Sequence, residues 1–150
     1  MIHQGKFKPR NLQKYLGDPT NIIFRSSWEL KLMMKCDKDP RIIKWASEEI
    51  AIPYRSPVDR RIHRYFPDFY IKSKSADGSI KEQIIEVKPK YQTQQPKKLK
   101  GRITKKKKST YLYEIRTWGI NQAKWEAAHY FCKKKGWVFK LMTEENLGMI

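Results

Sequence analysis

An α+β fold with a mixed central sheet is the fold class that the order of helix and strand patterns predicts. Three observations lead to it: a helical pattern near residue 30 runs directly into short strands, two strands joined by a turn follow, and a helix and a strand close the chain. The 150 residues, of which 39% are hydrophobic and 13% aromatic, suffice for one domain with a substantial core and are few for two. We therefore expect residues 1–150 to form a single domain.

The first 21 residues are basic and show no regular pattern. Lysines and an arginine alternate there with apolar residues such as Phe7, Leu12 and Tyr15. Two interpretations remain open: a basic N-terminal arm (about 1–21) that lies against nucleic acid, or a terminal segment packed on the domain.

A helix is predicted to begin at Ser26 or Ser27, which are both good N-caps, and to run to about Lys38, before Pro40. Within it, Glu29 shares a face with the apolar residues at i+3, i+4 and i+7. A carboxylate on an apolar stripe is costly unless something pairs with it. Glu29 is therefore a candidate to approach the sheet. The alternatives are an ordinary salt bridge or a first-turn acid favoured by the helix dipole.

Strand-like runs follow at 42–46 and 49–54, and a charged loop at 56–61 leads out of them. From 64 to 90 the alternation of apolar and polar residues predicts a hairpin. Its turn is placed at 76–79, because the sequence there is Ala-Asp-Gly-Ser, in which Gly adopts positive φ freely and Asp tolerates it.

The register of this hairpin brings charged residues together. Folding it about Asp77 places Asp68 opposite Glu86 and Phe66 opposite Lys88. Opposed like charges destabilise a sheet, so two carboxylates beside a lysine indicate that a divalent metal ion belongs between them. The alternative is a surface hairpin whose charges only keep it soluble, and a one-residue slip would separate the pair.

After Lys90 the composition changes. The segment of about 91–110 is rich in lysine and contains no acidic residue. Because like charges repel, we expect a polybasic, mobile insertion that tracks phosphates as a flap, with a solvated linker as the plainer interpretation.

Regular structure is expected to return at 111–118. A helix capped near Asn121 is predicted to run through Lys135, with Gly136 as its C-terminal stop and a strand at 137–141 after it. Helix then strand fits a crossover packed on one face of the sheet. The apolar stripe expected for this helix consists of Ala123, Ala127, Tyr130 and Phe131.

The overall charge indicates the partner. A formal net charge of +18, from 33 basic and 15 acidic residues, attracts a polyanion, and nucleic acid is the usual one. An anionic membrane surface is the weaker option, because no basic amphipathic helix stands out, and no apolar run is long enough to span a bilayer, so no membrane partner is expected. No phosphate-binding loop indicates a nucleotide cofactor. Cys36 and Cys132 lie far apart within helical patterns and are expected to be reduced core thiols.

The charged residues occur in the order Glu29, Pro67-Asp68 and Glu86-Val87-Lys88, on a helix and two antiparallel strands. A helical Glu followed by PD and ExK resembles the motif of the PD-(D/E)xK nuclease superfamily. The segments RSSWELKLMMKCDKDPRIIKWASEEIAIPY, YFPDFYI and IIEVKPK are similar to the catalytic domain of the TnsA family of transposon end-cleaving endonucleases.

A second resemblance spans essentially the whole chain. Its length, the basic insertion after EVKPK and the closing GWVFKLMTEENL look closer still to the head-completion nucleases of T-even-type tailed phages. The chain carries Glu86 at a position where the TnsA family also accepts Gln, and it lacks a region for binding a partner transposase. A role in transposition is therefore not expected.

These resemblances imply a PD-(D/E)xK restriction-endonuclease-like core, with a mixed central sheet flanked by helices, and a metal-dependent DNA endonuclease activity. They imply that Asp68 and Glu86 are ligands of Mg²⁺, for which Mn²⁺ would substitute, and that Glu29 is a further ligand, direct or through water. Lys88 would orient the attacking water or stabilise the transition state. Whether one or two ions bind stays open.

The resemblances also imply DNA as substrate, cleavage at or after packaging, the capsid portal or other head-completion proteins as partners, and the virion and host cytoplasm as location. Two other interpretations remain: a non-catalytic basic DNA-binding protein of the virion, and an RNA-binding protein, which leaves the clustered acids unexplained. The residues expected to hold the DNA backbone are Arg64, Lys90, Lys97, Lys98, Lys100, Arg102, Lys105, Lys106, Lys107 and Lys108.

Overall fold

A mixed four-stranded sheet forms the centre of the molecule in the computed structural model, which describes residues 4–146. Its strands stand in the order β3 (Ile42–Ser47), β6 (Phe69–Lys74), β7 (Ile80–Val87) and β8 (Val138–Met142). The first three are antiparallel neighbours, and β8 runs parallel to β7.

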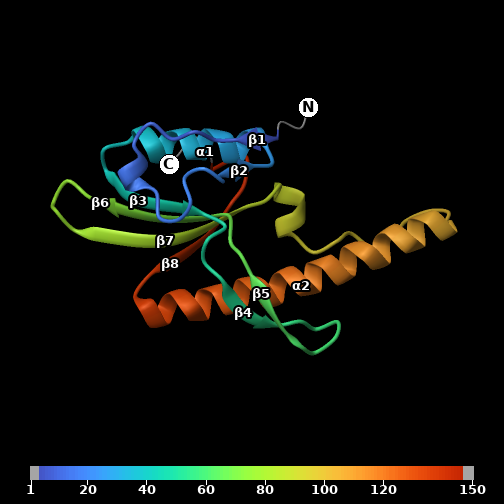
Figure 1. Cartoon of the computed structure of the whole chain (residues 1–150). Coiled ribbons are helices and arrows are strands. Elements are labelled where there is room, and N and C mark those ends of the chain that lie inside the picture. Colours follow the sequence, from blue (N-terminus) through green and yellow to red (C-terminus); the bar gives the residue numbers. More distant parts are fainter. Residues whose placement is uncertain (1–3, 147–150) are drawn as a thin grey trace.

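Two helices flank this sheet. Figure 1 shows α1 (Ser27–Lys38) on one face and α2 (Lys105–Lys135) on the other. This arrangement confirms the predicted α+β class with a mixed sheet between helices. None of the described helices is long and apolar enough to cross a membrane.

Two small antiparallel ribbons complete the strand inventory of the described residues. The first pairs β1 (Gly5–Lys6) with β2 (Ile23–Phe24), and the second pairs β4 (Ile52–Arg55) with β5 (Ile62–Tyr65). The β4–β5 ribbon crosses α2 and packs on it (Figure 1). Short 3-10 helices lie at Leu12–Lys14 and Lys90–Thr93.

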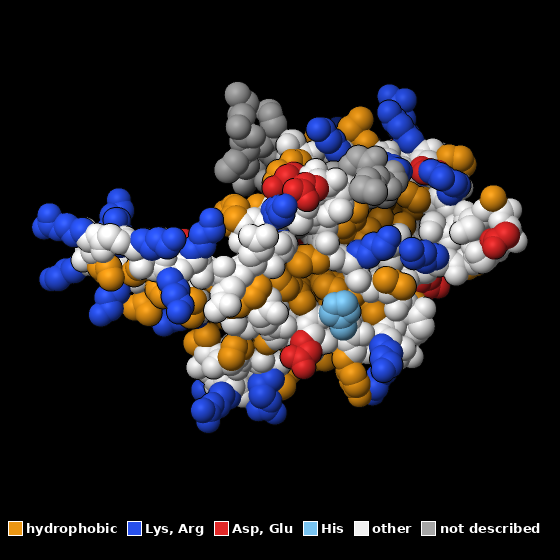
Figure 2. All heavy atoms as spheres, turned by 180° about the vertical axis from the view of Figure 1, so that it is seen from behind, with side chains coloured by type: hydrophobic (Ala, Val, Ile, Leu, Met, Phe, Trp, Pro, Cys, Tyr) orange, Lys and Arg blue, Asp and Glu red, His pale blue; other side chains and the backbone are white. Residues whose placement is uncertain are grey.

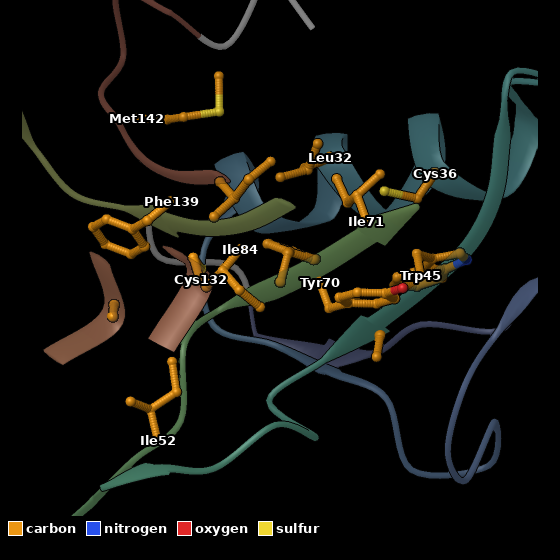
Figure 3. Close-up of a cluster of buried hydrophobic side chains, with 14 of the residues drawn as sticks. Leu32, Cys36, Trp45, Ile52, Tyr70, Ile71, Ile84, Cys132, Phe139 and Met142 are labelled. Atoms are coloured by element: carbon orange, nitrogen blue, oxygen red, sulfur yellow. The ribbon is translucent and has the colours of Figure 1, made fainter. Parts of the chain in front are cut away.

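The core lies on both faces of the sheet. In Figure 3, Leu32 and Cys36 reach from α1 toward Ile71 on β6, while Cys132 of α2 lies beside Ile84 of β7. Cys36 and Cys132 are both buried and unpaired, as predicted, and stand on opposite sides of the sheet. The large side chains that are almost fully buried are Met33, Trp45, Ile52, Phe69, Ile71, Ile84 and Ile85.

The predicted hairpin forms with the predicted register. Pairs run from Phe69 opposite Ile85 to Lys74 opposite Ile80, as folding about Asp77 requires. Gly78 takes φ +89°, and Asp77 Oδ1 accepts hydrogen bonds from the N–H of Ser79 at 2.9 Å and from its hydroxyl at 2.7 Å.

The prediction that one strand runs unbroken from residue 64 is wrong. The chain pairs with β4 up to Tyr65, breaks at Phe66-Pro67-Asp68, and enters the central sheet at Phe69. Pro67 has no N–H to donate, so the chain changes partners there. Phe66 is consequently not a ladder partner of Lys88, whose N–H donates instead to the Met142 carbonyl at 2.9 Å.

Residues 4–21 of the N-terminal segment pack on the domain, which was the second of the two interpretations. Tyr15 is buried with its ring 4.8 Å from that of Trp45. The buried carboxylate of Asp37 accepts hydrogen bonds from the N–H groups of Arg10 and Asn11, each at 3.0 Å. This segment is therefore fixed on α1 and β3 rather than held away as an arm, while residues 1–3 lie outside the described part.

The helix α2 begins at Lys105, 16 residues before the predicted cap at Asn121. Thr104 caps it by accepting a hydrogen bond from the Lys107 N–H at 3.1 Å. The four-lysine run 105–108 is therefore its first turn, because lysine is a good helix former when its side chain extends into solvent. Gly136 ends the helix with φ +73°, as predicted, and β8 follows parallel to β7, which confirms the crossover.

The phase of the buried stripe on α2 also differs from the prediction. The residues that face the sheet are Asn121, Trp125, Ala128 and Cys132, whereas Tyr130 of the predicted stripe is 62% exposed. This rotation turns Lys124 toward the interior, because it lies four and eight residues before Ala128 and Cys132.

Candidate active site

Asp68 and Glu86 meet where the β6–β7 ladder ends. Phe69 and Ile85 are its last pair, and Asp68 and Glu86 extend the same register by one step. The Asp68 N–H donates to Glu86 Oε1 at 3.3 Å, and the Val87 N–H donates to Asp68 Oδ2 at 2.8 Å. Glu86 is buried and Asp68 is partly buried, so the structure brings these two predicted site residues together out of bulk water.

This pair is electrostatically unfavourable as it stands. Burial raises the pKa of Asp68 well above its usual value, the charge of Glu86 raises it further, and the Val87 N–H and the charge of Lys88 act in the opposite direction. Like-charged carboxylates this close favour a cation between them. Oxygen donors with this deficit of positive charge fit a hard divalent ion such as Mg²⁺ or Mn²⁺.

Glu29 lies near this pair but not within it. Ser26 is the N-cap of α1, and its Oγ accepts a hydrogen bond from the Glu29 N–H at 3.2 Å. The same hydroxyl donates a hydrogen bond to Glu29 Oε2 at 3.1 Å. Burial raises the pKa of Glu29, and the next contribution is the negative charge of Asp68. Between residues 4 and 146, no three His, Cys, Asp or Glu side chains are close enough to hold one metal ion together. The expected trio is thus a close pair with Glu29 farther away.

Lys88 follows Glu86 on the same side of the strand, about 6.6 Å along it. Its backbone is fixed by the hydrogen bond from its N–H to β8, and its ammonium lowers the pKa of Asp68. The fourth predicted residue therefore also lies at this end of the sheet.

Four residues near the site were not predicted, and the first two are Glu48 and Arg25. Glu48 has φ +53°, donates its N–H to the Asp68 carbonyl at 3.2 Å, and forms an ion pair with Arg25. The other two are Tyr65 and Lys124. The hydroxyl of Tyr65 is buried and has no hydrogen-bond partner of normal geometry among residues 4–146, and burial followed by the charge of Glu86 raises the pKa of Tyr65. The sequence indicates Lys124 only when the buried stripe of α2 is placed in its observed phase, which differs from the predicted one.

The predicted DNA-binding residues fall into two groups. Arg64 lies on β5 with its guanidinium 5.7 Å from the Phe66 ring, and Lys90 is tied to Glu145 by an ion pair of 2.9 Å. Both are exposed and lie on the segments that lead into β6 and out of β7.

The second group lies away from the site, at the beginning of α2. Figure 2 shows that this end of the helix projects from the molecule and is covered with Lys and Arg side chains. The segment before it folds back along the helix, since Lys107 Nζ donates to the Arg102 carbonyl at 3.1 Å. A shallow groove between segment and helix is lined by five of the predicted lysines, which are Lys97, Lys98, Lys100, Lys106 and Lys107.

The comparisons with known proteins agree with this fold. The family model described as TnsA-like endonuclease N terminal matches residues 39–144, so the chain belongs to this endonuclease family. The matched range contains Asp68, Glu86 and Lys88, and Glu29 precedes it.

A curated relative is similar over almost the whole chain. It is the head completion nuclease of Enterobacteria phage T4, which is 41% identical over 147 residues, covering 98% of this chain and 95% of the relative. Both resemblances predicted from the sequence are thereby confirmed.

Proposed function

We propose that this protein is a metal-dependent DNA endonuclease that acts in the completion of phage heads, at or after DNA packaging. The observation that carries the proposal is the close pair Asp68 and Glu86 with Lys88 beside it, in a chain of the TnsA-like endonuclease family. Head completion is inferred from the name of the T4 relative.

Asp68 and Glu86 would hold a divalent cation, Mg²⁺ or Mn²⁺, and Glu29 would contribute through a water molecule. The bound cation would supply Lewis-acid polarisation of a phosphoryl oxygen and lower the pKa of a water molecule. The Val87 N–H holds the Asp68 carboxylate in orientation through its 2.8 Å hydrogen bond. Lys88 places a positive charge where negative charge builds up on the phosphate during in-line attack by water.

The DNA is held by positive charge, without base reading being required. Lysines on the projecting end of α2 and on the segment before it neutralise phosphates and release counterions, so binding should weaken steeply with salt. Arg64 and Lys90 would guide the strand beside the pair of acids.

Plasmid cleavage tests this proposal. Wild type should cut supercoiled DNA in Mg²⁺ or Mn²⁺ and not in EDTA, and Asp68→Asn, Glu86→Gln and Lys88→Met should each lose most of the activity. Glu82→Gln is the matched control, because Glu82 is an acid on the same strand and side, paired with Lys72 at 4.0 Å. It should cut like wild type.

Two results would oppose the assignment. Equal cleavage by wild type and the site variants would remove these residues from the chemistry. DNA binding without cleavage by any form would favour the non-catalytic DNA-binding protein of the virion.

Association with the particle is a separate part of the proposal. We infer that the protein is made in the host cytoplasm and joins the virion, with the portal or other head-completion proteins as neighbours. Detection in purified particles, followed by cross-linking and identification of the linked proteins, tests this part. Its absence from particles would contradict it.

A further inference from the structure

A lysine of α2 points into the molecule beside the candidate site. Lys124 is partly buried, and its ammonium lies 5.6 Å from the ring centroid of Tyr65 and 5.8 Å from that of Tyr54. Both tyrosines are buried and belong to the β4–β5 ribbon, so helix and ribbon enclose this ammonium between them.

The same face of the sheet carries the candidate site. Ile84 on β7 lies beside Cys132 of α2 (Figure 3), so alternation along β7 directs Glu86 and Lys88 toward the α2 side as well. Lys124 lies two turns before Cys132, directly before Trp125 of the buried stripe, and is itself partly buried. Burial lowers the pKa of Lys124, the charge of Glu86 raises it and that of Lys88 lowers it further, as expected for an ammonium within electrostatic reach of both.

This partly buried ammonium has aromatic rings beside it but no ion-pair partner in the described part of the chain. No carboxylate lies within ion-pair distance of Lys124 among residues 4–146. Burying an ammonium is costly, and a second lysine nearby adds repulsion. A phosphate group entering beside Glu86 would be attracted by both lysines.

We propose that Lys124 is a second lysine of the active site and binds the phosphate group at which the DNA strand is cut. This inference rests on the proposed function. The ammonium of Lys124 comes from α2, whereas Lys88 comes from the end of β7. Helix and strand would therefore hold the same phosphate from two sides.

A purely structural role would make Lys124 a clamp between two aromatic rings. The helix offers a control for this kind of contact in Lys135, an exposed lysine whose ammonium lies 5.3 Å from the Phe131 ring and 5.2 Å from the Trp137 ring, at the opposite end of the packed half of α2. Lys135→Met removes the same kind of contact without touching the site.

The experiment compares wild type, Lys124→Met, Lys124→Arg and Lys135→Met. It measures single-turnover cleavage of a saturating duplex in Mg²⁺, duplex affinity in EDTA, and unfolding temperature. We expect Lys124→Met to cut about 100-fold more slowly, the size typical of losing one transition-state donor, with affinity within about threefold of wild type. Lys124→Arg should recover part of the rate, and Lys135→Met should cut like wild type.

The outcomes separate the two proposals. If wild type and Lys124→Met cut at equal rates, the role of Lys124 is overturned and the proposed function stands. The same holds if Lys135→Met loses as much cleavage rate and as much unfolding temperature as Lys124→Met. No cleavage by wild type overturns the proposed function and this inference with it. Should Lys124→Met not fold, Lys124→Gln replaces it, and wild-type cleavage by folded Lys124→Gln would overturn the inference.

Discussion

Asp68 is held where its negative charge is unfavourable. Burial, followed by the charge of Glu86, raises its pKa well above the usual value. Because the pKa is higher in the folded than in the unfolded chain, ionisation of Asp68 weakens folding. This penalty is absent below the unfolded pKa of about 3.9 and complete above the folded pKa. The site therefore lowers stability at neutral pH, as is common where function and stability compete.

Removing that charge should stabilise the protein in the absence of metal. Asp68→Asn keeps an oxygen that can accept the Val87 N–H hydrogen bond. In EDTA at pH 7 we expect it to unfold at a temperature about 2–4 °C above that of wild type, the shift that about 1 kcal/mol produces in a chain of this size. The gap should narrow as the pH falls toward 4. Calorimetry across this range measures it, and a lower unfolding temperature for Asp68→Asn at pH 7 would contradict it.

Adding a divalent cation should reverse this order. Mg²⁺ at about 100 times its dissociation constant would stabilise wild type by about 2.7 kcal/mol, provided that it binds only the folded chain. Asp68→Asn and Glu86→Gln should gain little, and Glu82→Gln should gain as much as wild type. Thermal unfolding at increasing Mg²⁺ measures these gains. An equal gain in all four proteins would place the cation outside the acidic pair.

At the scale of elements, the cap of α1 connects helix stability to the site. Ser26 both accepts the Glu29 N–H and donates to the Glu29 carboxylate. Ser26→Ala should cost about 1 kcal/mol, as loss of an N-cap does, and release the Glu29 side chain, so cleavage should also slow. Ser27→Ala, one residue into the helix, is the control. Denaturant unfolding and plasmid cleavage measure both effects, and unchanged cleavage in Ser26→Ala would separate Glu29 from the chemistry.

The hairpin could be predicted because its rules are local. The turn residues fix where the chain reverses, and the count from Asp77 then determines that Asp68 and Glu86 are neighbours. Local rules do not predict the break at Pro67, because β5 pairs with β4, and that pairing depends on tertiary structure.

The errors on α2 have a different origin. The helix starts earlier than predicted because the helix propensity of lysine outweighs the repulsion among the charges of 105–108. The predicted stripe is one residue out of phase with the buried one, because several apolar residues on this helix, including Tyr130, are exposed. With the correct phase, Lys124 would have drawn attention for the same reason as Glu29, as a charge on a buried stripe.

On the scale of the whole molecule, α2 connects the candidate site to the basic surface. Its packed half carries Lys124 beside the pair of acids, and its projecting half carries lysines 105–108. These lysines lie 16–19 residues before Lys124, which corresponds to about 24–29 Å along the helix axis. If the duplex runs along this axis, they would meet phosphates about 7–8 base pairs from the cut, at 3.4 Å per base pair.

This geometry predicts that the projecting end of α2 contributes to DNA affinity and not to the cleavage step. Replacing Lys105, Lys106, Lys107 and Lys108 by alanine preserves helix propensity but removes four charges, so the slope of log affinity against log salt should flatten by up to about 3–4. The single-turnover cleavage rate on saturating DNA should stay near that of wild type, because the acids and Lys88 are untouched. Alanine at Lys133, Lys134 and Lys135 is the control at the other end of the helix.

The length of the duplex gives an independent test of where lysines 105–108 contact the DNA. Shortening one arm of the substrate below about 7 base pairs should flatten the salt slope of wild type and change that of the four-alanine variant little, because its contact is already missing. Fluorescence anisotropy over a series of arm lengths and salt concentrations measures both proteins. An identical length dependence in the two would mean that the projecting end of α2 does not follow the DNA, and that the charge which binds the duplex lies on the body of the domain.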